Sequence, residues 1–97
     1  MKSITIDELR AGRDIPLIDV REDHEFAAGR VPGAISIPMS QLGDRIGELP
    51  DGAFDVICQA GGRSAQVVAA LEARGYDATN VTGGTGEWAS RGFELER

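Results

Sequence analysis

A short apolar run that breaks into a glycine-rich turn and then a helical run is the strongest constraint on this chain. Phe54–Ile57 is followed by Cys58, by the turn Gln59-Ala60-Gly61-Gly62-Arg63-Ser64, and by a helix-forming run over 65–74. This order is typical of a buried parallel strand that leads into a helix on one face of a sheet. Open α/β sheets bind ligands at the carboxyl ends of such strands. The pattern therefore predicts an α/β fold with Cys58 at the binding edge of its sheet.

Two glycines in the turn allow backbone N–H groups to converge on the Cys58 sulfur. Gly61 and Gly62 can adopt positive φ without strain, and the following helix N-terminus adds partial positive charge. Such a turn stabilises a thiolate and binds the oxyanion of an incoming donor. A free cysteine taken alone is more often an inert packing residue, but its position here favours a functional thiol. We predict that Cys58 is the catalytic nucleophile and that the substrate-binding turn consists of Gln59, Ala60, Gly61, Gly62 and Arg63.

Composition limits the classes of function that remain. The 97 residues suffice for one domain over 1–97, and no apolar stretch approaches the ~20 residues that cross a bilayer. The net charge of −6 disfavours nucleic acid as a partner. One cysteine and one histidine make no metal site, and a lone cysteine forms no intrachain disulfide. The N-terminus turns acidic where a signal peptide would stay apolar, so we expect a cytoplasmic protein without membrane contact.

Short apolar runs alternate with helical runs along the chain. The first element is predicted to be a helix that begins with a capping box at Thr5 and Glu8 and ends at Gly12. Further helices are expected over 22–28, 40–49 and 87–90, and strands over 15–20, 35–37 and 78–81. This alternation predicts a parallel sheet covered on both faces. Asp55 is expected at a solvated entrance, because an unpaired charge inside a buried strand is costly.

Four motifs in this order resemble the single-domain rhodanese family: Leu17-Ile18-Asp19-Val20-Arg21, Gly29-Arg30-Val31-Pro32-Gly33-Ala34, Cys58-Gln59-Ala60-Gly61-Gly62-Arg63-Ser64 and Gly83-Gly84-Thr85-Gly86-Glu87-Trp88. The resemblance implies a three-layer α/β sandwich with a central, mainly parallel five-stranded sheet. It also implies a thiosulfate sulfurtransferase, which moves a sulfane sulfur from a donor such as thiosulfate to an acceptor such as cyanide. The sulfur would travel as a persulfide on Cys58, with no separate cofactor.

Alternative functions remain open at the cysteine turn. A persulfide carrier or regulatory module would use the same thiol to serve a persulfide-bearing or thiol-bearing partner protein. Cysteine phosphatases and arsenate reductases are less favoured, because four residues separate Cys58 from Arg63 whereas the related phosphatases have five. A shorter turn suits a sulfur atom better than a tetrahedral phosphate transition state.

Several polar residues are expected to support the turn rather than react. Arg63 could bind a donor's sulfonate, but pairing with a nearby carboxylate is slightly favoured. Asp19, Arg21 and Ser64 are expected to hold the turn in shape. His24, the only histidine, is expected to be solvated on a surface helix, while Phe26 and Trp88 are expected to pack in the core or at a hinge.

Overall fold

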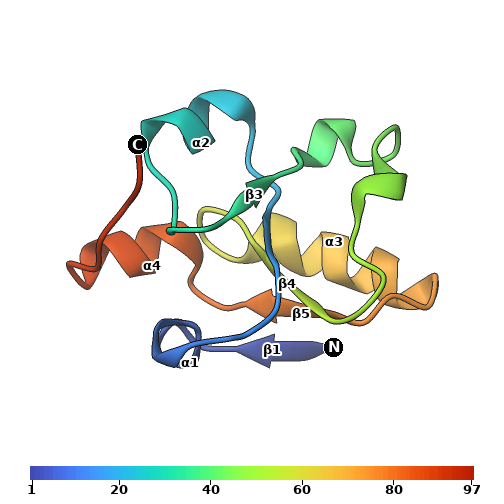
Figure 1. Ribbon diagram of the computed structural model, residues 1–97, viewed down its shortest axis with the longest axis horizontal. Helices are drawn as coiled ribbons and strands as arrows, with labels where there is room; N and C mark the ends of the chain where they lie inside the picture. The colour runs from blue at the N-terminus through green and yellow to red at the C-terminus, as the bar shows by residue number, and fades with distance from the viewer.

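A computed structural model describes residues 1–97 as a five-stranded sheet with helices on both faces (Figure 1). The strands are β1 (Lys2–Ile4), β2 (Leu17–Asp19), β3 (Ile35–Ser36), β4 (Phe54–Ile57) and β5 (Ala78–Val81). They lie in the order β1-β5-β4-β2-β3, and each pair of neighbours is parallel. The predicted α/β class and five-stranded sheet are confirmed, and the sheet is entirely parallel.

Two apolar clusters bury the two faces of this sheet. On one face, β2 and β4 pack against α3 (Gly62–Ala73), through residues such as Ile18, Val56 and Val68. On the other, Ile57 and Val81 pack with α1 (Ile6–Ala11) and with Trp88 of α4 (Gly84–Ser90). Side chains alternate between the faces along each strand, so every residue of β2, β4 and β5 is buried. The remaining helix, α2 (Asp23–Ala28), lies beside the carboxyl edge of the sheet (Figure 1).

The central strands bring the predicted site together at the carboxyl edge. Asp19 at the end of β2 is in register with Ile57 at the end of β4. Cys58 follows β4 directly, and α3 begins at Gly62. The turn after the cysteine and the segment after Asp19 therefore start side by side.

No helix of the fold is both long enough and apolar enough to cross a membrane.

The expectation that the first element is helical is wrong, because β1 precedes α1. Three residues of β1 pair with β5 at the sheet edge, and only Ile4 among them is buried. So short a strand with one buried side chain leaves almost no periodic signal. The helix that follows has the predicted capping box: Thr5 Oγ1 accepts from the Glu8 N–H at 3.1 Å, and Glu8 Oε1 accepts from the Thr5 N–H at 3.0 Å.

The predicted helix over 40–49 is also wrong. The chain forms two short 3₁₀ turns there, η1 (Met39–Gln41) and η2 (Ile46–Glu48). Gly43 and Gly47 lower the helix propensity of this segment, although Leu42 and Ile46 still pack against the core. The predicted helices after the two glycine motifs are present as α3 and α4. Each begins three residues earlier than predicted, at Gly62 and Gly84.

Asp55 does not lie at a solvated entrance, which corrects the prediction for this residue. It is 1% exposed in the interior of β4 and accepts two hydrogen bonds from Arg13, at 2.9 Å from Nε and 2.8 Å from Nη2. The Asp55 hydrogen bonds raise the pKa of Arg13 against the opposing effect of burial. A bidentate partner therefore replaces water as the means of stabilising this buried carboxylate.

Replacing Arg13 with methionine tests the importance of this pair. We expect Arg13→Met to lower the free energy of unfolding by about 3 kcal/mol, because the buried Asp55 carboxylate loses its partner. Chemical denaturation at neutral pH measures the change. The matched control is Arg45→Met, since the side chains of Arg13 and Arg45 are both 32% exposed but Glu48, the partner of Arg45, is 53% exposed. Equal losses in the two variants would contradict this account.

Candidate active site

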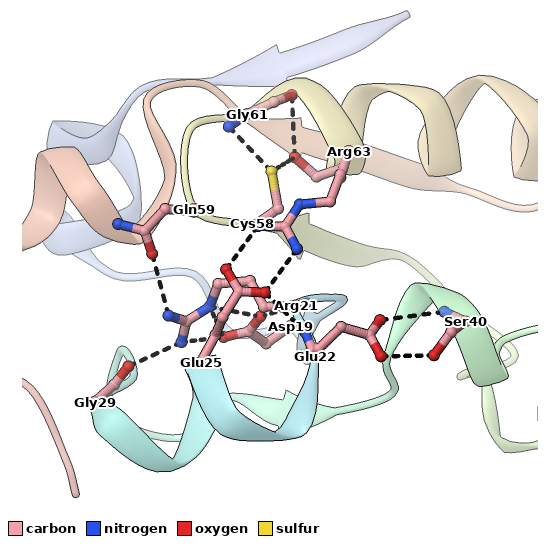
Figure 2. Close-up of polar contacts among 11 residues, drawn as sticks. Asp19, Arg21, Glu22, Glu25, Gly29, Ser40, Cys58, Gln59, Gly61 and Arg63 are labelled. Carbon is pink, nitrogen blue, oxygen red and sulfur yellow. Dashed lines mark hydrogen bonds and ion pairs between the residues drawn. The ribbon is translucent and has the colours of Figure 1, made fainter.

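The Cys58 sulfur lies beneath the turn that joins β4 to α3 (Figure 2). The Gly61 N–H donates to Sγ at 3.0 Å, and the Ser64 hydroxyl lies 3.3 Å from the same atom. Gly61 has a φ of +102°, a backbone conformation that glycine adopts without strain. Cys58 is only 1% exposed, so a reactant must present a projecting atom to the sulfur.

The environment of Cys58 lowers the pKa of its thiol. Burial acts in the opposite direction, because it disfavours the charged form. Hydrogen bonds from the Ser64 hydroxyl and from the backbone N–H groups of Ser64, Gly61 and Ala60 outweigh that cost. The thiolate is the nucleophilic form of cysteine, so the turn increases the reactive fraction at neutral pH.

The Ser64 hydroxyl has two acceptors within reach, Cys58 Sγ and the Gly61 carbonyl oxygen at 3.2 Å. That carbonyl also accepts from the Ala65 N–H at 3.1 Å and from Asn80 Nδ2 at 3.5 Å. Ser64 can therefore direct its hydrogen to the thiolate without leaving the carbonyl unpaired. Asn80 was not identified from the sequence, because nothing local marks the end of β5 as facing the turn.

Arg63 forms a bidentate ion pair with Glu25 of α2, with distances of 2.7 and 2.8 Å (Figure 2). Hydrogen bonding from Arg63 is the main reason that the pKa of Glu25 falls to about 2. The pair in turn raises the pKa of Arg63. Arg63 thus pairs with a carboxylate near the turn, and this carboxylate compensates the charge of its guanidinium. Glu25 was missed because it resembles any acidic residue on a surface helix.

Asp19 and Arg21 form a second, fully buried ion pair beside the turn. Arg21 Nη2 lies 2.9 Å from Asp19 Oδ2 and also donates to the Gly29 carbonyl at 2.8 Å. Its other terminal nitrogen, Nη1, donates to Gln59 Oε1 at 3.2 Å. The structure therefore places both residues next to the cysteine turn and links the Gln59 side chain to the end of α2.

The second glycine motif holds the cysteine turn from the opposite side. The Thr85 N–H donates to the Cys58 carbonyl and the Gly86 N–H to the Gln59 carbonyl, both at 2.9 Å. A Cβ at Gly84 would lie 2.6 Å from the Gln59 carbonyl oxygen, so no side chain fits at that position. The glycines of this motif appeared in the sequence as part of a family pattern, without an assigned role at the site.

The other predicted residues differ in their exposure and contacts. Within the turn, Gln59, Ala60 and Gly62 are exposed, although Gln59 also bonds Arg21 and Gly86. His24 is exposed on α2, and Trp88 is buried, with its ring edge against Phe93. Phe26 does not join either core cluster; it is half-buried beneath the Arg30 guanidinium, at 4.7 Å from the ring centre. The largest cavity, of about 460 Å³, lies away from Cys58 between α1 and Trp88.

The variant Ser64→Ala tests how the thiolate is stabilised. We expect the pKa of Cys58 to rise, because burial remains while the hydroxyl donor is lost. The alkylation rate at neutral pH should fall severalfold, and its pH midpoint should move upward. Iodoacetamide labelling as a function of pH measures both quantities. Ser90→Ala, on the exposed part of α4, is the control; identical profiles for the two variants would show that Ser64 does not stabilise the thiolate.

Comparisons with known proteins agree with this fold. The rhodanese-like domain model matches residues 5–91. A sulfurtransferase of Allochromatium vinosum is 36% identical over 84 residues, which cover 84% of this chain and 78% of that protein. Two crystal structures match over 100% of both chains: SSP1007 from Staphylococcus saprophyticus, at 43% identity and a TM-score of 0.89, and a rhodanese-like domain protein from Staphylococcus aureus, at 40% and 0.87. This chain therefore belongs to the rhodanese-like family.

Proposed function

We propose that this protein is a sulfurtransferase that carries sulfur as a persulfide on Cys58. The observation that supports it most is the set of donors around one sulfur: the Gly61 N–H at 3.0 Å, the Ser64 hydroxyl at 3.3 Å, and the lowered pKa that they produce. The same backbone N–H groups can stabilise the negative charge of a persulfide at the mouth of the turn. Family membership supports the same chemistry.

The reaction with thiosulfate and cyanide follows a double displacement. The Cys58 thiolate attacks the outer sulfur of thiosulfate, the S–S bond of the donor breaks, and sulfite leaves with the bonding electrons. Cyanide then attacks the outer sulfur of the Cys58 persulfide, so that thiocyanate leaves and the thiolate is restored. Splitting the transfer through a covalent intermediate lets one nucleophile serve two substrates.

The size of the turn and the state of Arg63 argue against phosphoryl transfer. Only four residues separate Cys58 from Arg63, and both terminal nitrogens of Arg63 already bind Glu25. A cysteine phosphatase needs its arginine to clamp the phosphate oxygens in the transition state. In this protein, Arg63 is paired with Glu25 instead, which argues against a phosphatase.

A persulfide carrier for a partner protein is the second candidate function. Both arginines at the site are compensated, Arg21 by Asp19 and Arg63 by Glu25, and the whole chain has a net charge of −6. An anionic donor such as thiosulfate therefore finds no free cation at the turn. A persulfide-bearing protein, which brings its own contact surface, would not need one.

Cys58→Ser tests the proposed nucleophile. After incubation with thiosulfate and removal of excess reagent, intact-protein mass spectrometry should show one added sulfur atom on the wild type and none on the variant. Cyanide should then remove the added mass from the wild type as thiocyanate forms. Serine keeps the size of the side chain but provides no stabilised anion at neutral pH.

Circular dichroism of Cys58→Ser provides the control for folding, and the variant should keep the wild-type spectrum. Sulfur on the variant would refute Cys58 as the acceptor atom. A wild type that loads slowly from thiosulfate but rapidly from a persulfidated protein would identify the carrier function.

Inserting one glycine after Gly62 tests the role of turn length. The insertion should reduce loading from thiosulfate, because the N–H groups no longer converge on Cys58 Sγ. Mass spectrometry of sulfur loading and a phosphate-ester hydrolysis assay measure the two activities. A glycine inserted after Gly52, in the exposed bend before β4, is the control. Unchanged loading in the turn variant would contradict the argument from turn size.

A further inference from the structure

The ion pair between Glu25 and Arg63 lies at the mouth of the cysteine turn. Arg63 belongs to the turn and Glu25 to α2, and their side chains point toward one another (Figure 2). The Arg63 side chain is 37% exposed and that of Glu25 is 23% exposed, so a molecule entering from solvent meets the pair. Glu25 is the main cause of the raised pKa of Arg63, and the negative charge of the Cys58 thiolate contributes to it. The guanidinium therefore lies close enough to the sulfur for its charge to act on a reactant.

The position of α2 does not depend on this pair alone. No residue of the helix is buried. Its two ends are held by other contacts: the Ser40 hydroxyl donates to Glu22 Oε1 at 2.6 Å, and Arg21 donates to the Gly29 carbonyl at 2.8 Å. Glu25→Gln keeps an oxygen that can accept the Glu22 N–H, as Glu25 Oε1 does at 3.1 Å. This substitution therefore removes a charge from the site and leaves the core untouched.

Glu25 is what compensates the charge of Arg63. Both terminal nitrogens of Arg63 donate to Glu25, and the guanidinium forms no other hydrogen bond. Because the Arg63 hydrogen bonds hold the pKa of Glu25 at about 2, the carboxylate stays ionised at neutral pH. Loss of the Glu25 charge would leave an uncompensated cation beside the Cys58 sulfur.

Such a cation would matter most for a donor that is an oxyanion. When the Cys58 thiolate takes the outer sulfur of thiosulfate, the S–S bond breaks and sulfite leaves with the bonding electrons. Negative charge then grows on sulfite, and a free guanidinium would both attract the donor and stabilise this leaving group. A donor whose transferred sulfur is bonded to an uncharged organic group needs no such cation.

We propose that Glu25 determines the class of sulfur donor: by pairing with Arg63, it disfavours small oxyanions such as thiosulfate and favours donors whose sulfur is bonded to an uncharged organic group. The inference rests on the proposed persulfide chemistry of Cys58. Glu25 acts through Arg63, so it is a positioning residue and not a catalytic one.

Two alkylating reagents measure the charge at the mouth without any sulfur transfer. Iodoacetate and iodoacetamide have nearly the same size and differ by one negative charge, and Cys58 is the only cysteine that can react. The ratio of their rate constants cancels any change in the thiolate fraction. Glu25→Gln should raise the ratio of iodoacetate to iodoacetamide by about fivefold, because an unpaired Arg63 attracts the anion. The increase should shrink at high salt.

The sign of the change distinguishes charge from structure. Arg63→Gln should lower the ratio, because Glu25 then remains as an uncompensated anion, and the double variant should return it to the wild-type value. Glu25→Asp keeps the charge and should keep the wild-type ratio. The matched control is Glu48→Gln, which removes the same charge from a bidentate pair with Arg45, at 2.8 Å for both bonds. Circular dichroism checks that each variant is folded.

An unchanged ratio in Glu25→Gln would overturn the proposal. So would a change in the same direction in Glu25→Gln and Arg63→Gln, or an equal increase in Glu25→Gln and Glu25→Asp, since either would reflect a disturbed turn.

Sulfur loading then tests the consequence for the donor. Glu25→Gln should lower the thiosulfate concentration that half-saturates loading of Cys58 by about fivefold, with a smaller change in the maximal rate. A raised alkylation ratio without this gain would overturn the assignment of donor class. Failure of thiosulfate and of inorganic polysulfide to place sulfur on Cys58, in the wild type and in Glu25→Gln alike, would instead overturn the proposed function.

Discussion

The close approach of two glycine-containing turns determines the geometry of the whole candidate site. The N–H groups of Thr85 and Gly86 bind the carbonyls of Cys58 and Gln59 at 2.9 Å, which requires that position 84 have no side chain. These bonds fix the peptide plane that follows the cysteine. Gly61 can then curl back so that its N–H meets Sγ. A side chain at position 84 would therefore displace the backbone of Cys58 and Gln59 and with it the thiol.

Ion pairs stabilise the surroundings of the turn, whereas dipoles stabilise its sulfur. Arg21 and Arg63 each neutralise a carboxylate and connect α2 to the cysteine turn. No cation forms a hydrogen bond with Cys58; its donors are the Ser64 hydroxyl and backbone N–H groups of the turn. Because fixed dipoles at close range are screened less by salt than separated charges, the acidity of this thiol should respond weakly to ionic strength.

Local sequence features predicted much of this fold, and long-range pairings account for most of what was missed around the site. The order of strand, cysteine turn and helix could be predicted because Phe54–Ile57, the glycines and the helical run lie next to one another. Glu25, the partner of Arg63, lies 38 residues away, and no local pattern connects the two. Asp55 was misplaced for the same reason, since Arg13 is 42 residues distant. β1 was missed because its pairing with β5 joins opposite ends of the chain.

Backbone groups and side chains have different roles around Cys58, and this difference determines which substitutions could change what the protein recognises. Main-chain N–H groups supply most of the hydrogen bonds that lower the pKa of Cys58, and Ser64 is the one side chain among them. Gln59 and Ala60, in contrast, expose their side chains at the mouth of the turn. Substitutions at these two positions can therefore alter which molecule is recognised while the acid strength of the thiol is retained. Reactivity and selectivity are encoded separately within the same short stretch of chain.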